Sequence, residues 1–270
     1  QKLGSYFDIM VQEKLLDLES RKGKAPRGVQ YPLPLAQRPF IFMNAVGMHD
    51  DVVTMMHESG HAFQSFEMNA LPFYHQTEIG MEIAEVASMS MELLGAPYLT
   101  KAKGGFYSEA EAAQAGLQHL EGILTGWLQI ALVDAFQHWI YENHGLASDP
   151  AACEAKYAEL IERFNGGVDW SGLEREKRFW QRILHIYEVP FYFIEYGLAQ
   201  LGAVQIWGNS LENPVQALQK YRQALALGAT RPLGELYAAA GAKFAFDAGT
   251  LGKAVALIER KITELEPLAG

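Results

Sequence analysis

Two histidines that are four residues apart occur in the pentapeptide His57-Glu58-Ser59-Gly60-His61. The segment around them is predicted to be a helix that starts near Asp50 and runs to about Asn69. Because four residues make slightly more than one helical turn, both imidazoles leave the same face and can bind one tetrahedral ion. Glu58 points beside them, at the open coordination position. The pattern therefore predicts a metal-binding helix.

A metal site needs a third protein ligand, and the next predicted helix, residues 78–94, can supply it. Four glutamates lie along this helix: Glu78, Glu82, Glu85 and Glu92. Their neighbours are apolar, and burying an unpaired carboxylate is costly, so this face is either exposed to solvent or the wall of a site. The spacing alone leaves the ligand role open between Glu82 and Glu85. A solvated acidic face is the alternative.

Two imidazoles and one carboxylate around an open position are the ligands of a catalytic zinc, and we predict one Zn²⁺ per chain. Such a zinc acts as a Lewis acid and lowers the pKa of the water that it binds. Glu58 would take the proton of this water as general base and later give it to the leaving amine. The metzincin pattern is excluded, because Gln64 and Glu67 stand where that class has glycine and histidine.

Apolar residues at helical spacing predict a mainly α-helical chain with a small β element. Besides the two helices above, we expect helices over residues 1–20, 107–142, 151–164, 173–186, 190–207, 214–227, 233–240 and 251–265. Residues 39–44 predict a strand, and the three prolines within residues 21–38 predict a loop. No repeat of fixed period indicates a solenoid. We expect residues 1–270 to form a single domain.

The composition excludes several classes of partner. With 22 basic and 32 acidic residues, the chain carries a formal net charge of −10, which repels nucleic acid and anionic membranes. No apolar run reaches the roughly 18 residues that a membrane-spanning helix needs. The single cysteine, Cys153, forms no internal disulfide, so a cytoplasmic location is expected. The start Gln1-Lys2-Leu3-Gly4 suggests a processed or truncated chain.

Three blocks, in this order, resemble the oligoendopeptidase F and thimet oligopeptidase family of zinc metallopeptidases: residues 57–64, 82–92 and 190–196. The resemblance implies a zincin-like, neurolysin-like catalytic domain. In that family the third zinc ligand is a glutamate about two dozen residues past the second histidine, and another glutamate follows seven residues later. The resemblance thus selects Glu85 as the third zinc ligand, and Glu92 corresponds to the glutamate seven residues later. Either Glu92 or Glu82 would orient a zinc-bound imidazole.

The family also uses a histidine and tyrosines from a C-terminal segment to hold the scissile carbonyl and its oxyanion. The matching residues here are His185, Tyr192 and Tyr196. A donor aimed at the developing negative charge lowers the barrier by about 3 kcal/mol. The alternative is that the two tyrosines, four residues apart, only pack a helix.

Residues 40–47 resemble the family's strand beside the active site, whose free edge could pair with an extended substrate backbone. Asn44, Ala45 and Gly47 would then line the substrate cleft. A plain core strand is the alternative.

Family members are about twice as long as this chain, and their channel lies between two lobes. The resemblance therefore assigns this chain to the catalytic C-terminal part, with an N-terminal lobe missing or supplied by another polypeptide. We predict a zinc metalloendopeptidase that hydrolyses internal bonds of short peptides. One alternative is a helical peptide-binding or scaffold protein whose metal is structural or vestigial. The other is a carboxydipeptidase.

Overall fold

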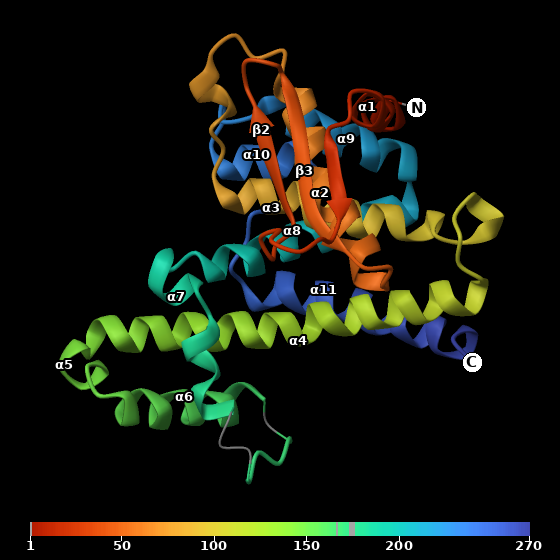
Figure 1. The fold of residues 1–270 in the computed structure, drawn as a ribbon. Helices are drawn as coiled ribbons and strands as arrows, with labels where there is room; N and C mark the ends of the chain where they lie inside the picture. Colours follow the sequence, from red (N-terminus) through yellow and green to blue (C-terminus); the bar gives the residue numbers. More distant parts are fainter. Residues whose placement is uncertain (1, 166, 173–175) are drawn as a thin grey trace. The chain divides into compact units, whose positions relative to one another are not determined.

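The computed structural model describes residues 2–165, 167–172 and 176–270 (Figure 1). The described chain divides into two compact units. The first contains the chain up to Gln118 together with Ala199–Gly270, and the second contains His119–Leu198. The prediction that residues 1–270 form a single catalytic domain stays a prediction.

A three-stranded sheet forms one part of the first unit. It follows helix α1 (Lys2–Gln12) and consists of β1 (Leu16–Glu19), β2 (Val29–Leu33) and β3 (Arg38–Ala45). The strand order is β1-β3-β2, with β1 parallel and β2 antiparallel to β3 (Figure 1). The central strand β3 is therefore paired on both edges, and its alternate residues Ile41 and Met43 are buried.

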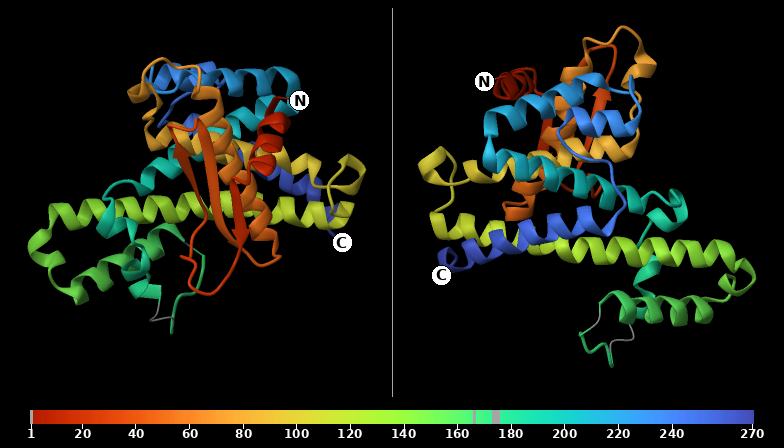
Figure 2. Two further views of the ribbon diagram at one scale, coloured as in Figure 1. Left: turned by 45° about the horizontal axis from the view of Figure 1, so that its top comes forward. Right: turned by 180° about the vertical axis from the view of Figure 1, so that it is seen from behind.

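Helices α2 (His49–Met68) and α3 (Met81–Gly95) pack against each other beside this sheet, and the 3₁₀ helix η1 (Tyr74–Thr77) lies between them in sequence. Figure 2 shows α2 lying along the sheet. The carboxylate of Asp51 accepts from the backbone N–H groups of Val46, Gly47 and Met48, at 2.8, 2.7 and 2.8 Å. These bonds fix the start of α2, as the aspartates in its first turn led us to expect.

The C-terminal part of the first unit contains the end of α8 (Phe193–Glu212), α9 (Pro214–Leu227), α10 (Leu233–Ala239) and α11 (Ala248–Leu265). Of these, α8, α9 and α10 share a hydrophobic core with α3. The Tyr221 hydroxyl donates to the Ala87 carbonyl at 2.7 Å, and the Tyr237 hydroxyl donates to the Glu82 carbonyl at 2.9 Å. Both tyrosines are buried in the core that α3 shares with these helices, so α3 is fixed along its length.

The second unit is helical. It contains the later part of α4 (Glu109–Glu142), α5 (His144–Ala147), α6 (Pro150–Phe164), η4 (Glu176–Arg182), α7 (His185–Glu188) and the start of α8. Its core includes Phe136, Tyr157 and Ile183. Short 3₁₀ helices η2 (Ala96–Tyr98), η3 (Lys101–Lys103) and η5 (Glu266–Leu268) complete the described elements.

The N-terminal predictions were partly wrong. The predicted helix over residues 1–20 ends at Gln12, after which the chain turns at Lys14, with φ of 56°, and enters β1. The predicted loop over residues 21–38 contains β2, which tolerates Pro32 because an edge strand does not need every backbone N–H. The free edge predicted for residues 40–47 is closed only in part, because β1 pairs with one edge of β3 and β2 pairs with Arg38–Phe42 on the other.

Three helix boundaries also differ from the prediction. The helix predicted from residue 78 begins at Met81. The helix predicted over residues 173–186 is divided into η4 and α7, while residues 173–175 lie outside the described residues. The helix predicted from residue 190 begins at Phe193, and Tyr192 therefore precedes it. The remaining helices agree with the predicted ranges to within a few residues.

Among the described helices, none combines the length and the hydropathy that crossing a membrane requires.

The backbones of α2 and α3 approach each other closely at Gly60. A Cβ atom there would lie 2.5 Å from the Ala87 carbonyl oxygen and 2.6 Å from the Ser88 Cα. We expect Gly60→Ala to lower the free energy of unfolding by about 1–3 kcal/mol, because backbone on the facing helix cannot yield cheaply. Chemical denaturation measures this change.

Gly126→Ala is the matched control, since Gly126 lies within α4 and has open space around it. Alanine there should be neutral or stabilising by up to about 1 kcal/mol, the intrinsic helix preference. If Gly60→Ala and Gly126→Ala changed the free energy of unfolding equally, the close approach at Gly60 would be contradicted.

Candidate metal centre and active site

His57, His61 and Glu85 converge in the first unit. Their candidate ligand atoms all lie within 4.8 Å of one another. The Glu85 Oε2 atom is 3.3 Å from His57 Nε2 and 3.7 Å from His61 Nε2. The two imidazole rings are 5.0 Å apart at 83°. The helix pair α2 and α3 thus brings both histidines of the pentapeptide to one carboxylate.

Each of these three side chains is oriented by a further contact. His57 Nδ1 is 2.6 Å from Glu92 Oε1, and His61 bonds to the backbone of Ala84. The Ser88 hydroxyl donates to Glu85 Oε2 at 2.9 Å. A bond at Nδ1 fixes the imidazole tautomer and leaves Nε2 to a metal, which is the usual arrangement around a metal-bound histidine.

The donor set fits a tetrahedral ion. Two ligand atoms about 2.0–2.1 Å from zinc, at a tetrahedral angle, lie about 3.4 Å apart. The distances of 3.3 and 3.7 Å from Glu85 Oε2 to the two imidazoles are close to this value. Imidazole nitrogen and carboxylate oxygen are also ligands that zinc prefers. His57, His61 and Glu85 are therefore able to hold one divalent ion.

Burial and close charges shift the pKa values in this group. Burial would lower the pKa of His57, but Glu85 and Glu92 outweigh it and raise the pKa to about 10. Burial lowers the pKa of His61 to about 4. Burial also acts on Glu85, but hydrogen bonding to His57 brings its pKa below the ordinary value. Charges buried this closely are costly unless they are paired or bind a metal.

Glu58 lies beside the metal group and is 6% exposed. Burial raises the pKa of its carboxyl to about 7, against the effect of a hydrogen bond from the backbone N–H of Gln30. Gly28 also approaches closely, since a Cβ atom there would be 3.5 Å from Glu58 Oε1. Gly28 and Gln30 are not among the predicted site residues, because the sequence predicts a loop over residues 21–38. The β-branched and aromatic residues of Val29-Gln30-Tyr31 favour a strand and are the signal that could have indicated β2.

The structure distinguishes the two glutamates that the sequence offered for orienting a histidine. Glu92 is buried on α3 and contacts His57. Glu82 lies in the first turn of α3, and its carboxylate folds back toward Gly80. A carboxylate at this end interacts favourably with the helix dipole, which gives Glu82 a local role.

His185, Tyr192 and Tyr196 form an aromatic cluster within the second unit. The His185 ring stacks on Tyr192, with centroids 5.6 Å apart at 26°, and meets Tyr196 edge-on at 5.8 Å. The Tyr196 hydroxyl is 3.5 Å from His185 Nε2, the outer limit of a hydrogen bond. Burial lowers the pKa of His185, which favours the neutral imidazole. All three side chains are half-buried.

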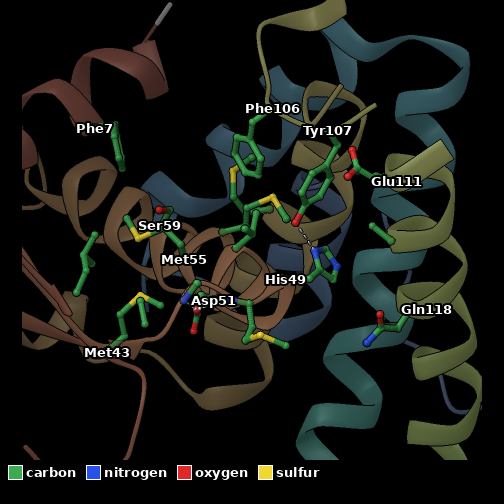
Figure 3. Close-up of a pocket in the computed structure, with 18 of the residues that line it drawn as sticks. Phe7, Met43, His49, Asp51, Met55, Ser59, Phe106, Tyr107, Glu111 and Gln118 are labelled. Atoms are coloured by element: carbon green, nitrogen blue, oxygen red, sulfur yellow. Dashed lines mark hydrogen bonds between the residues drawn. The ribbon is translucent and has the colours of Figure 1, made fainter. Parts of the chain in front are cut away.

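The three predicted substrate-binding residues have different surroundings. Asn44 donates through Nδ2 to the carbonyls of Ala25 and Arg27, at 2.6 and 3.2 Å. Ala45 and Gly47 instead line a pocket of about 890 Å³ (Figure 3).

This pocket is mostly apolar and lies within the first unit. Phe7 and Met43 line it on one side, and Figure 3 shows His49 bonded to Tyr107 on the other. Further along α2, the pocket is also lined by Val52, Met55, Met56, Ser59 and Phe63. Because these positions recur at helical spacing and exclude the two histidines, the pocket and the metal group use different faces of α2.

The sequence profile of peptidase family M3 matches residues 7–254. The chain belongs to peptidase family M3. The resemblance to oligoendopeptidase F inferred from three sequence blocks is thus confirmed. The predicted fold class, mainly α-helical with a small sheet, is confirmed as well.

Two curated relatives of this M3 chain are bacterial oligopeptidases. Chromosomal oligoendopeptidase F of Lactococcus lactis subsp. cremoris is 26% identical over 99% of this chain and 43% of the relative. Oligopeptidase PepF of Bacillus subtilis is 23% identical over 98% of this chain and 40% of the relative. The chain therefore spans less than half the length of these relatives.

Two solved structures have the same fold. The structure described as PZ peptidase A with inhibitor 2 has a TM-score of 0.87 and 32% identity, covering 97% of this chain and 46% of that chain. A protein assigned as oligoendopeptidase F has a TM-score of 0.86 and 32% identity, covering 99% of this chain and 46% of that chain.

The contact between Glu92 and His57 generates a prediction for metal affinity. Glu92→Gln keeps the size of the side chain but removes the charge that fixes the His57 tautomer. We expect zinc affinity to fall by about 10–100-fold, as for other partners of metal-bound histidines. Competition with a chromophoric chelator measures the affinity.

Glu82→Gln is the matched control on the same helix and should leave zinc affinity unchanged, because the Glu82 carboxylate folds toward Gly80. If Glu82→Gln lost zinc affinity and Glu92→Gln did not, the assignment of Glu92 as the residue that orients His57 would be wrong.

Proposed function

We propose that this M3 chain is the catalytic part of a zinc-dependent metalloendopeptidase that hydrolyses internal bonds of short peptides. The observation that carries the proposal is the convergence of His57, His61 and Glu85, with the buried carboxylate of Glu58 beside them. The names of the two bacterial relatives support an oligopeptide substrate.

His57, His61 and Glu85 would hold the zinc, and Glu92 would orient His57. When bound, zinc supplies Lewis-acid polarisation of the scissile carbonyl and of water. With three protein ligands among the described residues, the fourth position of a tetrahedral ion would be left to water or substrate, which supports a catalytic over a structural site.

Glu58 acts as the general base and then as the general acid in this proposal. It removes a proton from the attacking water and later delivers it to the nitrogen of the leaving amine. The hydrogen bond from Gln30 and the surrounding burial hold its carboxylate in one place. Fixed geometry of this kind is what proton transfer in a transition state requires.

His185, Tyr192 and Tyr196 are proposed to hold the scissile carbonyl and stabilise its oxyanion. Phenol hydroxyls and an imidazole N–H are suitable donors, and one such donor lowers the barrier by about 3 kcal/mol. The stacked and edge-on contacts among the three rings support the proposal, because they restrict the ring orientations before substrate binds.

The outer edge of β2 takes the role that the sequence had suggested for residues 40–47. Gln30 on β2 reaches Glu58 through its backbone, whereas β3 lies between β1 and β2 in the sheet. We propose that an extended substrate backbone pairs along β2, with the carbonyls of Gln30 and Pro32 facing it. Because the pocket lined by Ala45 and Gly47 uses another face of α2, a role of these two residues in substrate binding stays a prediction, and Asn44 would act indirectly.

The remaining length of the relatives suggests a further lobe. Since this chain covers 43% and 40% of the two relatives, we propose that an N-terminal lobe completes the substrate channel. The cytoplasmic location stays a prediction.

Two alternatives are separated by simple measurements. A helical scaffold with a structural metal needs a closed shell of four protein ligands, while the group among the described residues has three. A carboxydipeptidase would release only C-terminal dipeptides, so the product masses from a blocked peptide distinguish it from an endopeptidase.

Glu58→Gln should retain zinc and lose about 10²–10⁴ in kcat, because the amide cannot accept the proton. Hydrolysis of a quenched fluorescent peptide measures kcat, and metal analysis confirms zinc content. Glu78→Gln is the control, since Glu78 is exposed and precedes α3. Turnover by Glu58→Gln at the original rate would disprove the proposed base.

Removing the metal should abolish hydrolysis without unfolding the chain, because the core clusters of both units are built from apolar side chains. After treatment with a chelator, activity is measured before and after one equivalent of Zn²⁺ is restored. Full activity in the metal-free chain would contradict a zinc mechanism.

A further inference from the structure

The segment between β1 and β2, residues 20–28, is held from inside by Lys24. Its side chain has no exposed surface, although the segment lies at the surface. The Lys24 ammonium donates to the Asp17 carbonyl at 3.0 Å, to Asp17 Oδ1 at 3.0 Å and to the Glu19 carbonyl at 2.9 Å. It also lies 4.5 Å from the centre of the Phe42 ring. Its three N–H donors are thus all used, on β1.

Asn44 holds the same segment from the central strand. Its amide nitrogen donates to the carbonyls of Ala25 and Arg27, at 2.6 and 3.2 Å. Lys24 and Asn44 therefore tie neighbouring positions of one segment to two adjacent strands. We call these two residues the clamp.

The segment that the clamp holds leads directly to Glu58. Gly28 packs closely against two residues of α2. A Cβ atom at position 28 would lie 2.6 Å from Thr54 Cγ2 and 3.5 Å from Glu58 Oε1. Two residues later, the Gln30 backbone N–H bonds to the Glu58 carboxylate. A shift of Gly28 away from β3 would pull on Val29 and Gln30, the first residues that pair with β3, and so displace this donor from Glu58.

We propose that Lys24 and Asn44 are positioning residues, which hold Gly28 and Gln30 against the carboxylate of Glu58. The proposal rests on the proposed function, because it concerns the residue assigned as general base. Neither clamp residue touches the metal ligands in the contacts that the described residues make, so the clamp acts on proton transfer and not on zinc affinity.

Lys24→Met tests the clamp. Methionine keeps an unbranched side chain over Phe42 but removes the three donors. In the zinc-loaded chain, we expect kcat for a quenched fluorescent peptide to fall about 10–100-fold, with KM and zinc content nearly unchanged, because small displacements of a catalytic group cost this much. Lys22→Met is the matched control: it makes the same change of charge on an exposed neighbour and should keep kcat.

Asn44→Ala should reproduce the loss of kcat, and Lys24→Arg should restore part of it by keeping a cationic donor. Asn69→Ala is the control for asparagine, because Asn69 donates to the Gln37 carbonyl at another corner of the sheet. In the double variant Lys24→Met/Asn44→Ala, kcat should fall by less than the product of the two single-variant factors, since both residues hold one segment.

Hydrogen–deuterium exchange provides a readout that needs no activity. Lys24→Met and Asn44→Ala should each raise exchange of the backbone amides of residues 27–31, including Gln30, by at least about tenfold. The control variants Lys22→Met and Asn69→Ala should leave the exchange of these amides unchanged.

Unchanged exchange in both clamp variants, or unchanged kcat in folded and zinc-loaded Lys24→Met, would overturn the proposal. A rise in KM at constant kcat would also overturn it. If the unsubstituted zinc-loaded chain fails to cleave peptides, the proposed function fails instead, and the exchange experiment still decides whether the clamp holds the segment.

Discussion

The packing of α2 against α3 at Gly60 is the contact on which the rest of the site depends. Because glycine has no Cβ, the backbone at Ala87 and Ser88 approaches α2 directly. This short separation places the imidazoles of one helix within 4.8 Å of a carboxylate on the other. Tyr221 and Tyr237 extend the constraint, since their hydroxyls bind the α3 backbone from the C-terminal helices. Helices α9 and α10 thus help to hold α3 in position against α2.

The electrostatics of the centre follow from this packing. Three buried carboxylates, Glu58, Glu85 and Glu92, surround two imidazoles, and such a group is stable only when the charges are paired or bind a cation. Each carboxylate has a different environment, which separates their chemistry. Glu85 faces both histidines, Glu92 contacts His57, and Glu58 bonds to the β2 backbone. The roles proposed for Glu85, Glu92 and Glu58 therefore differ because of their positions, although all three residues are glutamates.

Local patterns predicted much of this arrangement. Helix α2 was expected over residues 50–69 and spans His49–Met68, because a pair of aspartates and the apolar spacing are local signals. Strands β1 and β2 were missed because each depends on pairing with β3, a non-local contact that neither segment displays by itself. The sequence also left Glu82 and Glu92 equivalent, since only the position of α3 decides which carboxylate meets His57. Gln30 was missed for the same reason as β2.

The most direct test of the account is anomalous scattering at the zinc absorption edge from crystals of the zinc-loaded chain. The proposed zinc site predicts one anomalous peak, about 2.0–2.2 Å from His57 Nε2, His61 Nε2 and a Glu85 carboxylate oxygen. A peak bound by other residues, or one with the Glu85 carboxylate outside coordination distance, would contradict the account.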